Sequence, residues 1–189
     1  MRKIIQFMHV SLDGFVADPN GGLDWISYDK DLENHADNVI QNKIDVAIYG
    51  RVTYQLMESY WPTVPSNPSS SEHDLNHAHW VEHVSKIVVS RSLETAEWNN
   101  TTLIRDNILE EISSLKKQPG KDMMIFGSPR LSYILMQLGL IDEIQITLNP
   151  VLLGNGIPMY KDIEDKRKLK LLSSKTFDSG VVALHYQCL

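Results

Sequence analysis

Short runs of apolar and β-branched residues recur along the chain, and most of them end at a glycine, a serine or a polar turn. Runs of about four to eight such residues are typical of buried strands. The pattern therefore predicts eight strands, over residues 4–10, 45–49, 86–90, 101–104, 123–126, 143–148, 169–176 and 181–187.

Apolar residues with helical spacing fill most of the intervals between these strands. In the segment 29–42, Leu32, Ala36 and Ile40 share one face of a predicted helix. The other predicted helices cover residues 52–60, 73–83, 107–117 and 129–138. Residues 62–71 contain three prolines and four serines, which favours a surface loop.

Strands alternate with helices for most of the chain, and the end differs. There, Asp178-Ser179-Gly180 separates the last two predicted strands and indicates a hairpin. Alternation of this kind is typical of a three-layer α/β/α fold, with a mixed, mostly parallel sheet and helices on both of its faces. We find no internal repeat and no linker, so we expect residues 1–189 to form a single domain.

Composition narrows the classes of partner and compartment. Hydrophobic residues make up 42% of the 189 residues, the formal net charge is −6, and Lys and Arg form no long block. Nucleic acid and anionic membranes are therefore not expected as partners. The single cysteine, Cys188, leaves no intramolecular disulfide, which fits a reducing, cytoplasmic compartment. The N-terminal segment predicts a first strand rather than a secretion signal.

Four histidines, His73, His77, His79 and His83, lie close together in the predicted helix 73–83. Pairs of them are one helical turn apart, but neither pair has the H-E-x-x-H arrangement of a zinc site. We interpret the segment as a solvated helix face and expect no metal site.

Ligands of open α/β sheets bind beyond the carboxyl ends of the strands, where loops lead into helices. The first such junction is Gly50 to Thr53. Gly50 lets the backbone approach a ligand closely, Arg51 offers a fork of donors, and Thr53 adds a hydroxyl. A helix N-terminus at this point suits a phosphate group. The alternative is an ordinary strand-to-helix turn with a solvent-facing arginine.

A second junction repeats the pattern at residues 127–130. Gly127 ends a strand, Ser128 can cap the helix that follows, Pro129 suits the first helical position, and Arg130 comes next. This is a second candidate phosphate site. A well-capped helix would explain the serine and proline without any ligand, but it leaves the repeated glycine unexplained.

A third strand end carries Ser90, Arg91 and Ser92, which could hold a further phosphate, such as the one on the adenosine ribose of NADPH; a solvated loop is the alternative. Several nucleotide motifs are missing from the sequence. There is no G-x-x-x-x-G-K-[ST], and no G-x-G-x-x-G follows the first strand, so a P-loop site and a standard Rossmann site are not expected.

Several motifs, in order and spacing, resemble those of the dihydrofolate reductase-like superfamily. They are similar to the branch represented by the C-terminal reductase domain of bifunctional riboflavin biosynthesis proteins, and the resemblance covers nearly the whole chain. The motifs are SLDGFVA at 11–17, DW at 24–25, GRVTY at 50–54, IFGS at 125–128, GLIDE at 139–143 and NPVLLGNG at 149–156.

The resemblance implies a dihydrofolate reductase-like fold with about eight strands, NADPH as the hydride donor, and a homodimer. It implies that the loops at 50–53 and 127–130 hold the cofactor phosphates and that Ser90 and Arg91 lie by the adenosine end. The segment from His9 to Gly14, which includes Val10, would lie near the nicotinamide.

The chain also departs from its relatives in this resemblance. Family members often carry two adjacent glycines where this chain has Gly127-Ser128. The zinc deaminase segments that are commonly fused to the riboflavin enzyme are missing here. Authentic folate reductases have a carboxylate on the helix after the tryptophan-bearing loop, and Asp29 and Asp31 lie in that vicinity.

Two carboxylates are candidates for the catalytic proton transfer that must accompany hydride transfer. Asp13 and Asp24 flank the loop that would lie over the nicotinamide. Asp13 could equally be a turn residue that bonds to nearby backbone groups.

Four side chains are candidates for the wall of a flat substrate site: Trp25, Tyr54, Met57 and Trp61. Core packing would explain the same residues. Together, the junctions and the resemblance predict an NADPH-dependent reductase of a small heterocyclic or sugar-phosphate substrate, similar to 5-amino-6-(5-phosphoribosylamino)uracil reductase. A dihydrofolate or pterin reductase, and a non-catalytic NADPH-binding or sensing protein, are the alternatives.

Overall fold

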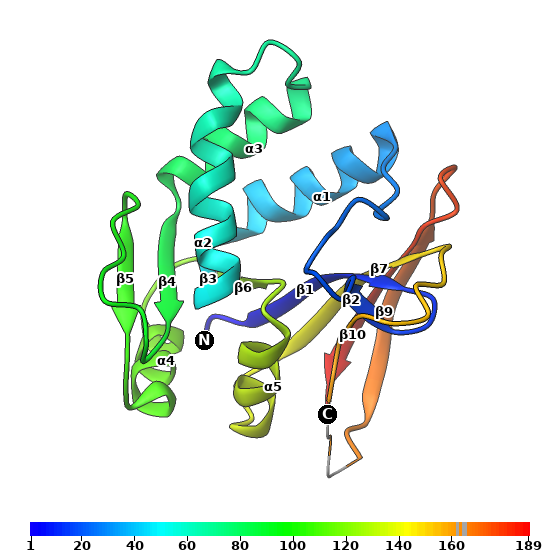
Figure 1. The fold of residues 1–189 in the computed structure, drawn as a ribbon. Coiled ribbons are helices and arrows are strands. Elements are labelled where there is room, and N and C mark those ends of the chain that lie inside the picture. The colour runs from blue at the N-terminus through cyan, green and yellow to red at the C-terminus, as the bar shows by residue number, and fades with distance from the viewer. Residues whose placement is uncertain (162, 164–165) are drawn as a thin grey trace.

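The computed structural model describes residues 1–161, 163 and 166–189, and an eight-stranded sheet runs through the middle of the molecule (Figure 1). The strand order is β5-β4-β3-β6-β1-β7-β10-β9. The strands are β1 (Ile4–Ser11), β3 (Ile44–Gly50), β4 (Ser85–Val89), β5 (Thr101–Ile104), β6 (Asp122–Phe126), β7 (Glu143–Asn149), β9 (Leu169–Thr176) and β10 (Val182–Cys188).

The sheet is mostly parallel and ends in an antiparallel hairpin. Every neighbouring pair from β5 to β7 is parallel. Strand β10 pairs antiparallel with β7, and β9 pairs antiparallel with β10. The hairpin turn is closed by a hydrogen bond from Gly180 N to the Phe177 carbonyl at 2.9 Å. The predicted mixed sheet and C-terminal hairpin are therefore confirmed.

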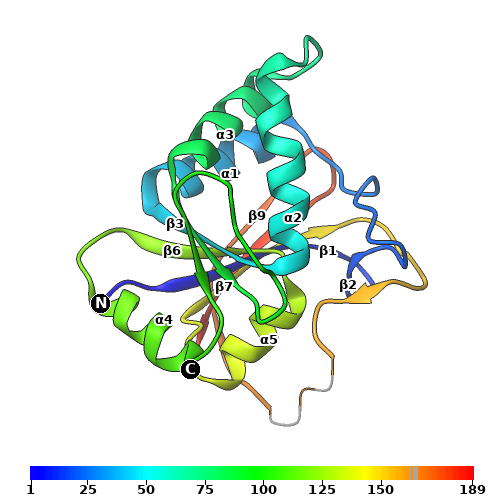
Figure 2. The same cartoon turned by 60° about the vertical axis from the view of Figure 1, so that its left-hand side comes forward.

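Helices cover both faces of the sheet, which confirms the three-layer α/β/α architecture. Helices α1, α2 and α3 pack on one face, and α4 and α5 pack on the other (Figure 2). Their bounds are α1 (Lys30–Lys43), α2 (Arg51–Tyr60), α3 (Glu72–His83), α4 (Ile108–Lys117) and α5 (Pro129–Gln137). In the described ranges, no helix combines the length and apolarity that crossing a bilayer requires.

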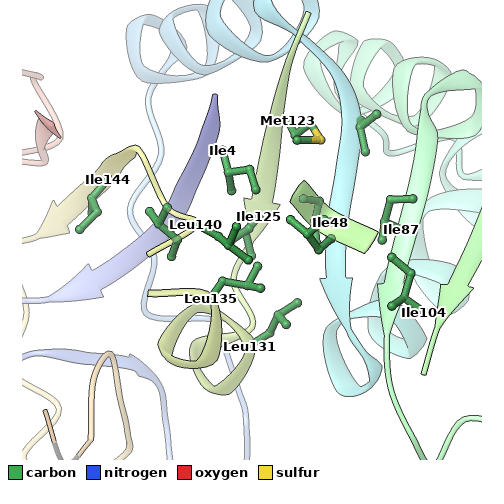
Figure 3. Packing of buried hydrophobic residues seen from close by; sticks show 13 residues of the cluster. Ile4, Ile48, Ile87, Ile104, Met123, Ile125, Leu131, Leu135, Leu140 and Ile144 are labelled. Atoms are coloured by element: carbon green, nitrogen blue, oxygen red, sulfur yellow. The ribbon is translucent and has the colours of Figure 1, made fainter. Parts of the chain in front are cut away.

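Alternation along the central strands supplies a separate core to each face. In β1, Ile4 points into the α4–α5 core (Figure 3), whereas Ile5 points into the α1–α3 core. In β6, Ile125 belongs to the α4–α5 core and Met124 belongs to the α1–α3 core. Fully buried strands such as these carry near-continuous apolar runs, which is why the sequence pattern located them.

Every predicted helix and strand lies within one residue of its observed bounds. Local signals explain the accuracy at two helix starts. Asp29 caps α1 by accepting a hydrogen bond from Leu32 N at 2.8 Å. Ser71 and Asp74 form a reciprocal capping box at the start of α3.

Two features differ from the sequence prediction. The first half of the expected loop 62–71 belongs to a 3-10 helix, η1 (Trp61–Ser66). Pro62 lies in its first turn, where a missing N–H group costs no hydrogen bond. In addition, β2 (Phe15–Ala17) and β8 (Ile157–Pro158) form a small antiparallel sheet. A two-residue strand such as β8 has too short a pattern to be found from sequence.

Candidate functional site

The two glycine-ended junctions lie side by side at the carboxyl ends of the parallel strands. Strands β3 and β6 are neighbours, with Ile48 opposite Ile125. Each strand ends in an aromatic residue and a glycine, and the Tyr49 and Phe126 rings lie 5.9 Å apart between centroids. The strands lead directly into α2 and α5. The shared location follows from the parallel pairing, because parallel strands end on the same side.

Ser128 connects these junctions through its hydroxyl group. It accepts a hydrogen bond from Gly50 N at 2.8 Å and donates one to Thr53 Oγ1 at 2.8 Å. Ser128 is buried and has a left-handed backbone with φ of 53°. Gly127, with φ of 54°, turns in the same sense. We call residues 50–53 and 127–130 the glycine junctions.

The helices that begin at the glycine junctions have open N-termini. Neither α2 nor α5 has a side-chain hydrogen bond at its cap or an acidic residue in its first turn. By contrast, α1, α3 and α4 each carry two acidic residues in the first turn. Unpaired N–H groups and the partial positive charge of a helix start attract anions. Two such helix starts side by side suit a ligand with more than one phosphate group.

Cationic side chains lie at both junctions. Arg51 and Arg130 are exposed at the first and second positions of α2 and α5. Arg51 donates a hydrogen bond to Gln55 Oε1 of its own helix at 3.1 Å. Pro129 occupies the first position of α5, as expected.

The third strand end lies next to the first junction. Strand β4 pairs with β3, and Gly50 is opposite Val89, the residue before Ser90. The Ser90 hydroxyl accepts hydrogen bonds from the backbone of Ser92 and Leu93 at 3.2 and 3.0 Å. Arg91 is exposed, with its Nε 3.8 Å from Asp106 Oδ1. All three predicted sites therefore lie together at the carboxyl ends of neighbouring parallel strands.

At the end of β1, the Asp13 carboxylate ties two loops together. It accepts hydrogen bonds from Ser11 Oγ at 2.6 Å, Gly154 N at 2.7 Å and Leu153 N at 3.1 Å. The Ser11 hydroxyl, followed by these backbone amides, holds the pKa of Asp13 below its usual range. These contacts favour the turn role that the sequence left open, since an ionised carboxylate has no proton to donate.

The other residues expected near β1 lie in three different settings. Val10 is buried against Met8 and Val16. Asp24 is exposed in the turn before α1. Trp25 is half-buried, and its indole N–H donates to the Gly22 carbonyl at 3.2 Å.

Aromatic side chains form a continuous series of ring contacts on the α1–α3 face, next to the glycine junctions. Centroid distances along the series are 5.7 Å from Tyr28 to His9, 5.2 Å to Phe7, 6.2 Å to Phe126, 6.4 Å to His77, 4.4 Å to Trp61 and 5.0 Å to Tyr60. We call these seven residues the aromatic belt.

The aromatic belt carries no charge near neutral pH. Burial lowers the pKa of His9 and of His77 to about 4, and a tyrosine side chain ordinarily ionises only near pH 10. The His9 ring is fixed by a contact of 2.5 Å between its Nδ1 and Thr147 Oγ1. Phe126 is buried, whereas Tyr28 and Tyr60 are exposed, so the outer members of the belt offer an uncharged aromatic surface to the face of a planar ring.

Only part of the predicted substrate wall lies in the aromatic belt. Trp61 belongs to it, and its indole N–H contacts the sulfur of Met57 at 3.0 Å. Tyr54 is only 1% exposed and lies in the core. Its hydroxyl donates to Glu58 at 2.8 Å and accepts from Trp98 N at 3.0 Å. For Tyr54, the structure therefore selects the core alternative.

The four histidines of the segment 73–83 differ in how deeply they are buried. His79 and His83 are exposed, as expected for a solvated face. That interpretation is wrong for His77, which is half-buried against Trp61, Trp80 and Phe126. The sequence signal for the aromatic belt was weak, because it consisted only of Phe7 and His9 at alternate positions of β1.

A separate cavity of about 220 Å³ lies beneath α1, between it and strands β7 and β10. It shares Phe7 with the aromatic belt but contains no residue of the glycine junctions. We therefore place the candidate site at the junctions and the belt, where the anion-binding and ring-binding features meet.

The two acidic residues considered for folate recognition have structural roles. Asp29 caps α1, and its second oxygen accepts from Ser179 N at 2.9 Å. Asp31 forms an ion pair with Lys175 at 2.8 Å. These contacts do not point to a pterin site at either residue.

A family model, described as the RibD C-terminal domain, matches residues 2–183. A curated relative, the uncharacterized protein YyaP of Bacillus subtilis (strain 168), is 37% identical over 187 residues, which are 98% of this chain and 94% of the relative. The chain is thus similar along its length to a protein whose own activity is uncharacterized.

Solved structures share the fold at low sequence identity. A putative riboflavin biosynthesis protein from Shewanella sp. PV-4 has a TM-score of 0.77 at 20% identity, with 99% of both chains covered. Dihydrofolate reductase from Enterococcus faecalis, complexed with NADP(H), has a TM-score of 0.63 at 13% identity, with 98% of this chain and 96% of that chain covered. The dihydrofolate reductase-like fold is therefore confirmed.

A third solved structure is the diaminohydroxyphosphoribosylaminopyrimidine deaminase/5-amino-6-(5-phosphoribosylamino)uracil reductase from Thermotoga maritima. Its TM-score is 0.67 at 15% identity, with 100% of this chain and 57% of that chain covered.

Proposed function

The chain belongs to the family of the RibD C-terminal domain, and from this premise we propose that it is an NADPH-dependent reductase of a small heterocyclic or sugar-phosphate substrate. Such an activity would be similar to that of 5-amino-6-(5-phosphoribosylamino)uracil reductase. The observation that carries the proposal is the pair of open helix N-termini at the glycine junctions, joined by Ser128.

The residues present fit a phosphorylated dinucleotide. Gly50 and Gly127 leave the backbone at both junctions without side chains, and a Cβ atom added at Gly50 would make an ordinary contact of 3.4 Å with Ser128 Oγ. In the proposed mode, the phosphates contact the backbone at both junctions, and Ser90 and Arg91 contact the adenosine ribose end. The β1 end at Val10 would lie by the nicotinamide. The proposed cofactor-binding residues are Val10, Gly50, Arg51, Thr53, Ser90, Arg91, Gly127, Ser128, Pro129 and Arg130.

The bound cofactor would supply the hydride, and the chain would supply position and a dry surface. The aromatic belt would hold a flat substrate ring next to Gly127 and exclude water from its face. Asp13 would act as a positioning residue, because its bonds fix the loop at 153–154 against the β1 end. Of the two candidate carboxylates, the exposed Asp24 is the one that would relay a proton from water to the substrate.

We also propose that the chain forms a homodimer through β9. All eight residues of β9 are exposed, including Leu169, Leu171 and Leu172, and β9 is one of the two edge strands of the sheet, opposite β5. An exposed apolar edge strand is a site for pairing with another chain. A second copy would cover the same leucines with its own, as a two-fold interface requires.

The test of the reductase proposal is a titration with NADPH, followed by an assay of NADPH oxidation. The aminouracil ribosyl phosphate and dihydrofolate would be compared as substrates. We expect NADPH to bind and the aminouracil to be the better substrate. Oxidation with dihydrofolate alone would favour a folate reductase, and binding without turnover would favour a sensing protein. Failure of NADPH to bind would remove all three readings.

A further inference from the structure

We infer that His77 recognises the edge of an uncharged planar heterocycle, as the hydrogen-bonding residue of the aromatic belt. This inference rests on the proposed function, since it names the substrate class of that site. Sequence comparison and family membership assign no role to this residue, and the sequence pattern placed it on a solvated face.

The His77 ring is held in place by aromatic neighbours from three elements. Trp61 lies 4.4 Å away between ring centroids, Trp80 lies 5.4 Å away, and Phe126 meets the imidazole nearly edge-on at 6.4 Å. These contacts fix the plane of the imidazole without using its nitrogens. The ring is therefore oriented in advance, which lowers the entropy cost of binding a partner.

Within the described residues, neither ring nitrogen of His77 has a hydrogen-bond partner in the protein. Other histidines of the same helix differ. His73 Nδ1 is 2.9 Å from Asp37 Oδ2, and His83 Nδ1 is 2.8 Å from the His79 carbonyl. Neither nitrogen is among the fully buried side-chain atoms without a partner, so both reach solvent and are open to a ligand. A neutral imidazole offers one donor and one acceptor, which matches the edge of a pyrimidine or pterin ring.

The position of His77 connects this recognition to the glycine junctions. Phe126, which it contacts, directly precedes Gly127. A ring bound at His77 would therefore lie near the end of β6, where the cofactor is proposed to bind.

The charged groups around His77 disfavour an anion on this side of the belt. Asp74 lies on α3, the helix of His77, and Asp37 lies on α1. Both carboxylates act electrostatically on the His77 imidazole, and His73 contacts Asp37 between the two helices. In addition, Asp37 Oδ1 is buried and has no partner among the described residues. Arg51 and Arg130 are instead at the junctions. We therefore expect a neutral ring with N–H donors at His77, rather than a phosphate or carboxylate group.

The test measures binding of two uncharged probes, 5,6-diaminouracil and 7,8-dihydropterin, without cofactor. Trp61 and Trp80 flank His77, so tryptophan fluorescence reports occupation directly. His77→Phe keeps the ring shape and removes the hydrogen bonds, so we expect about tenfold weaker binding of at least one probe. His77→Gln retains a donor and an acceptor and should bind within about threefold of the native chain.

The matched control is His79→Phe, which makes the same replacement on the exposed side of the same helix and should leave binding unchanged. In the complete reaction, His77→Phe should raise KM while kcat and the Kd for NADPH stay near their native values. Equal binding of both probes by the native chain and His77→Phe would overturn the inference, as would an equal loss in His79→Phe. Because the probes are measured without NADPH, failure of NADPH binding would remove the proposed function and leave this result standing.

Discussion

The Ser128 hydroxyl donates a hydrogen bond to Thr53 Oγ1 across 2.8 Å, and so joins the start of α5 to the first turn of α2. The same oxygen accepts from Gly50 N, so one buried side chain sets the spacing between two strand ends. In this chain, the separation of the two proposed phosphate contacts therefore depends on Ser128.

Replacing Ser128 tests this dependence. Ser128→Ala removes both hydrogen bonds and leaves Gly50 N without its partner, so we expect a loss of about 1–3 kcal/mol in the free energy of unfolding. NADPH binding should weaken as well. Ser128→Gly loses the same bonds but removes the left-handed strain, worth about 1 kcal/mol, and should be less destabilised than Ser128→Ala. Urea unfolding and calorimetric titration measure the two effects.

The control for this pair is Ser114→Ala, on the exposed surface of α4. An exposed substitution of this type should change stability by less than about 0.5 kcal/mol. If Ser128→Ala were as stable as the control and bound NADPH normally, the two hydrogen bonds of Ser128 would contribute neither to stability nor to cofactor binding.

Arg51 is the second point at which the proposed cofactor site can be tested. Arg51→Ala should weaken NADPH binding by about 1.5–3 kcal/mol, because a charge-assisted hydrogen bond to phosphate is lost. Gln55→Ala is the matched control, since Gln55 is the side chain that Arg51 contacts in its own helix. Titration calorimetry at one fixed salt concentration gives both values. An unchanged affinity in Arg51→Ala would take this arginine out of the site.

The sequence was sufficient to predict the glycine junctions one at a time, because each is a local pattern of an apolar run, a glycine and a helix start. It did not show that they are adjacent. Strand β6 pairs with β3 although β4 and β5 lie between them in sequence. The hydroxyl of Ser128, which is 78 positions along the chain from Gly50, was predicted as a local cap and instead makes a long-range contact.

The aromatic belt was harder to predict for a related reason. Tyr54 lies near the start of the predicted helix 52–60 and Trp61 directly follows it, yet one aromatic residue is in the core and the other is in the belt. The sequence pattern does not distinguish His77 from its exposed neighbour His79. The packing of α3 against Phe126 partly buries His77. Burial from packing also lowers the His77 pKa, so the charge state of the site is a tertiary property.

The proposed homodimer depends on the exposed leucines of β9. Leu171→Lys should convert the dimer to a monomer, because a charge would be buried against the apolar surface of the second copy. Leu109→Lys, at a similarly exposed position on α4, is the control and should not change the assembly. Light scattering after size exclusion at several concentrations measures the mass. A native chain that stays monomeric at all concentrations would contradict the proposal.

The half-buried His9 and His77 make the free energy of unfolding depend on pH in a defined direction. Burial lowers the pKa of His9 and of His77 to about 4, against a usual value of 6.5. Between these values the unfolded chain binds more protons than the folded chain, so stability is lost as pH falls from 6.5 towards 4. From pH 7 to pH 5, we expect a loss of about 1–2 kcal/mol for each of these histidines, since one pKa unit corresponds to about 1.36 kcal/mol.

Urea unfolding of the native chain and of His77→Gln at pH 7 and pH 5 separates this contribution from the others. This window lies above the pH at which ordinary carboxyl groups take up protons. Burial also lowers the pKa of His35, which therefore contributes equally to both proteins and cancels in the comparison. The variant should lose less stability than the native chain over this interval, because glutamine does not titrate. If both proteins lost the same free energy, the His77 imidazole would have to be charged in the folded chain at pH 5, contrary to its packing between Trp61 and Trp80.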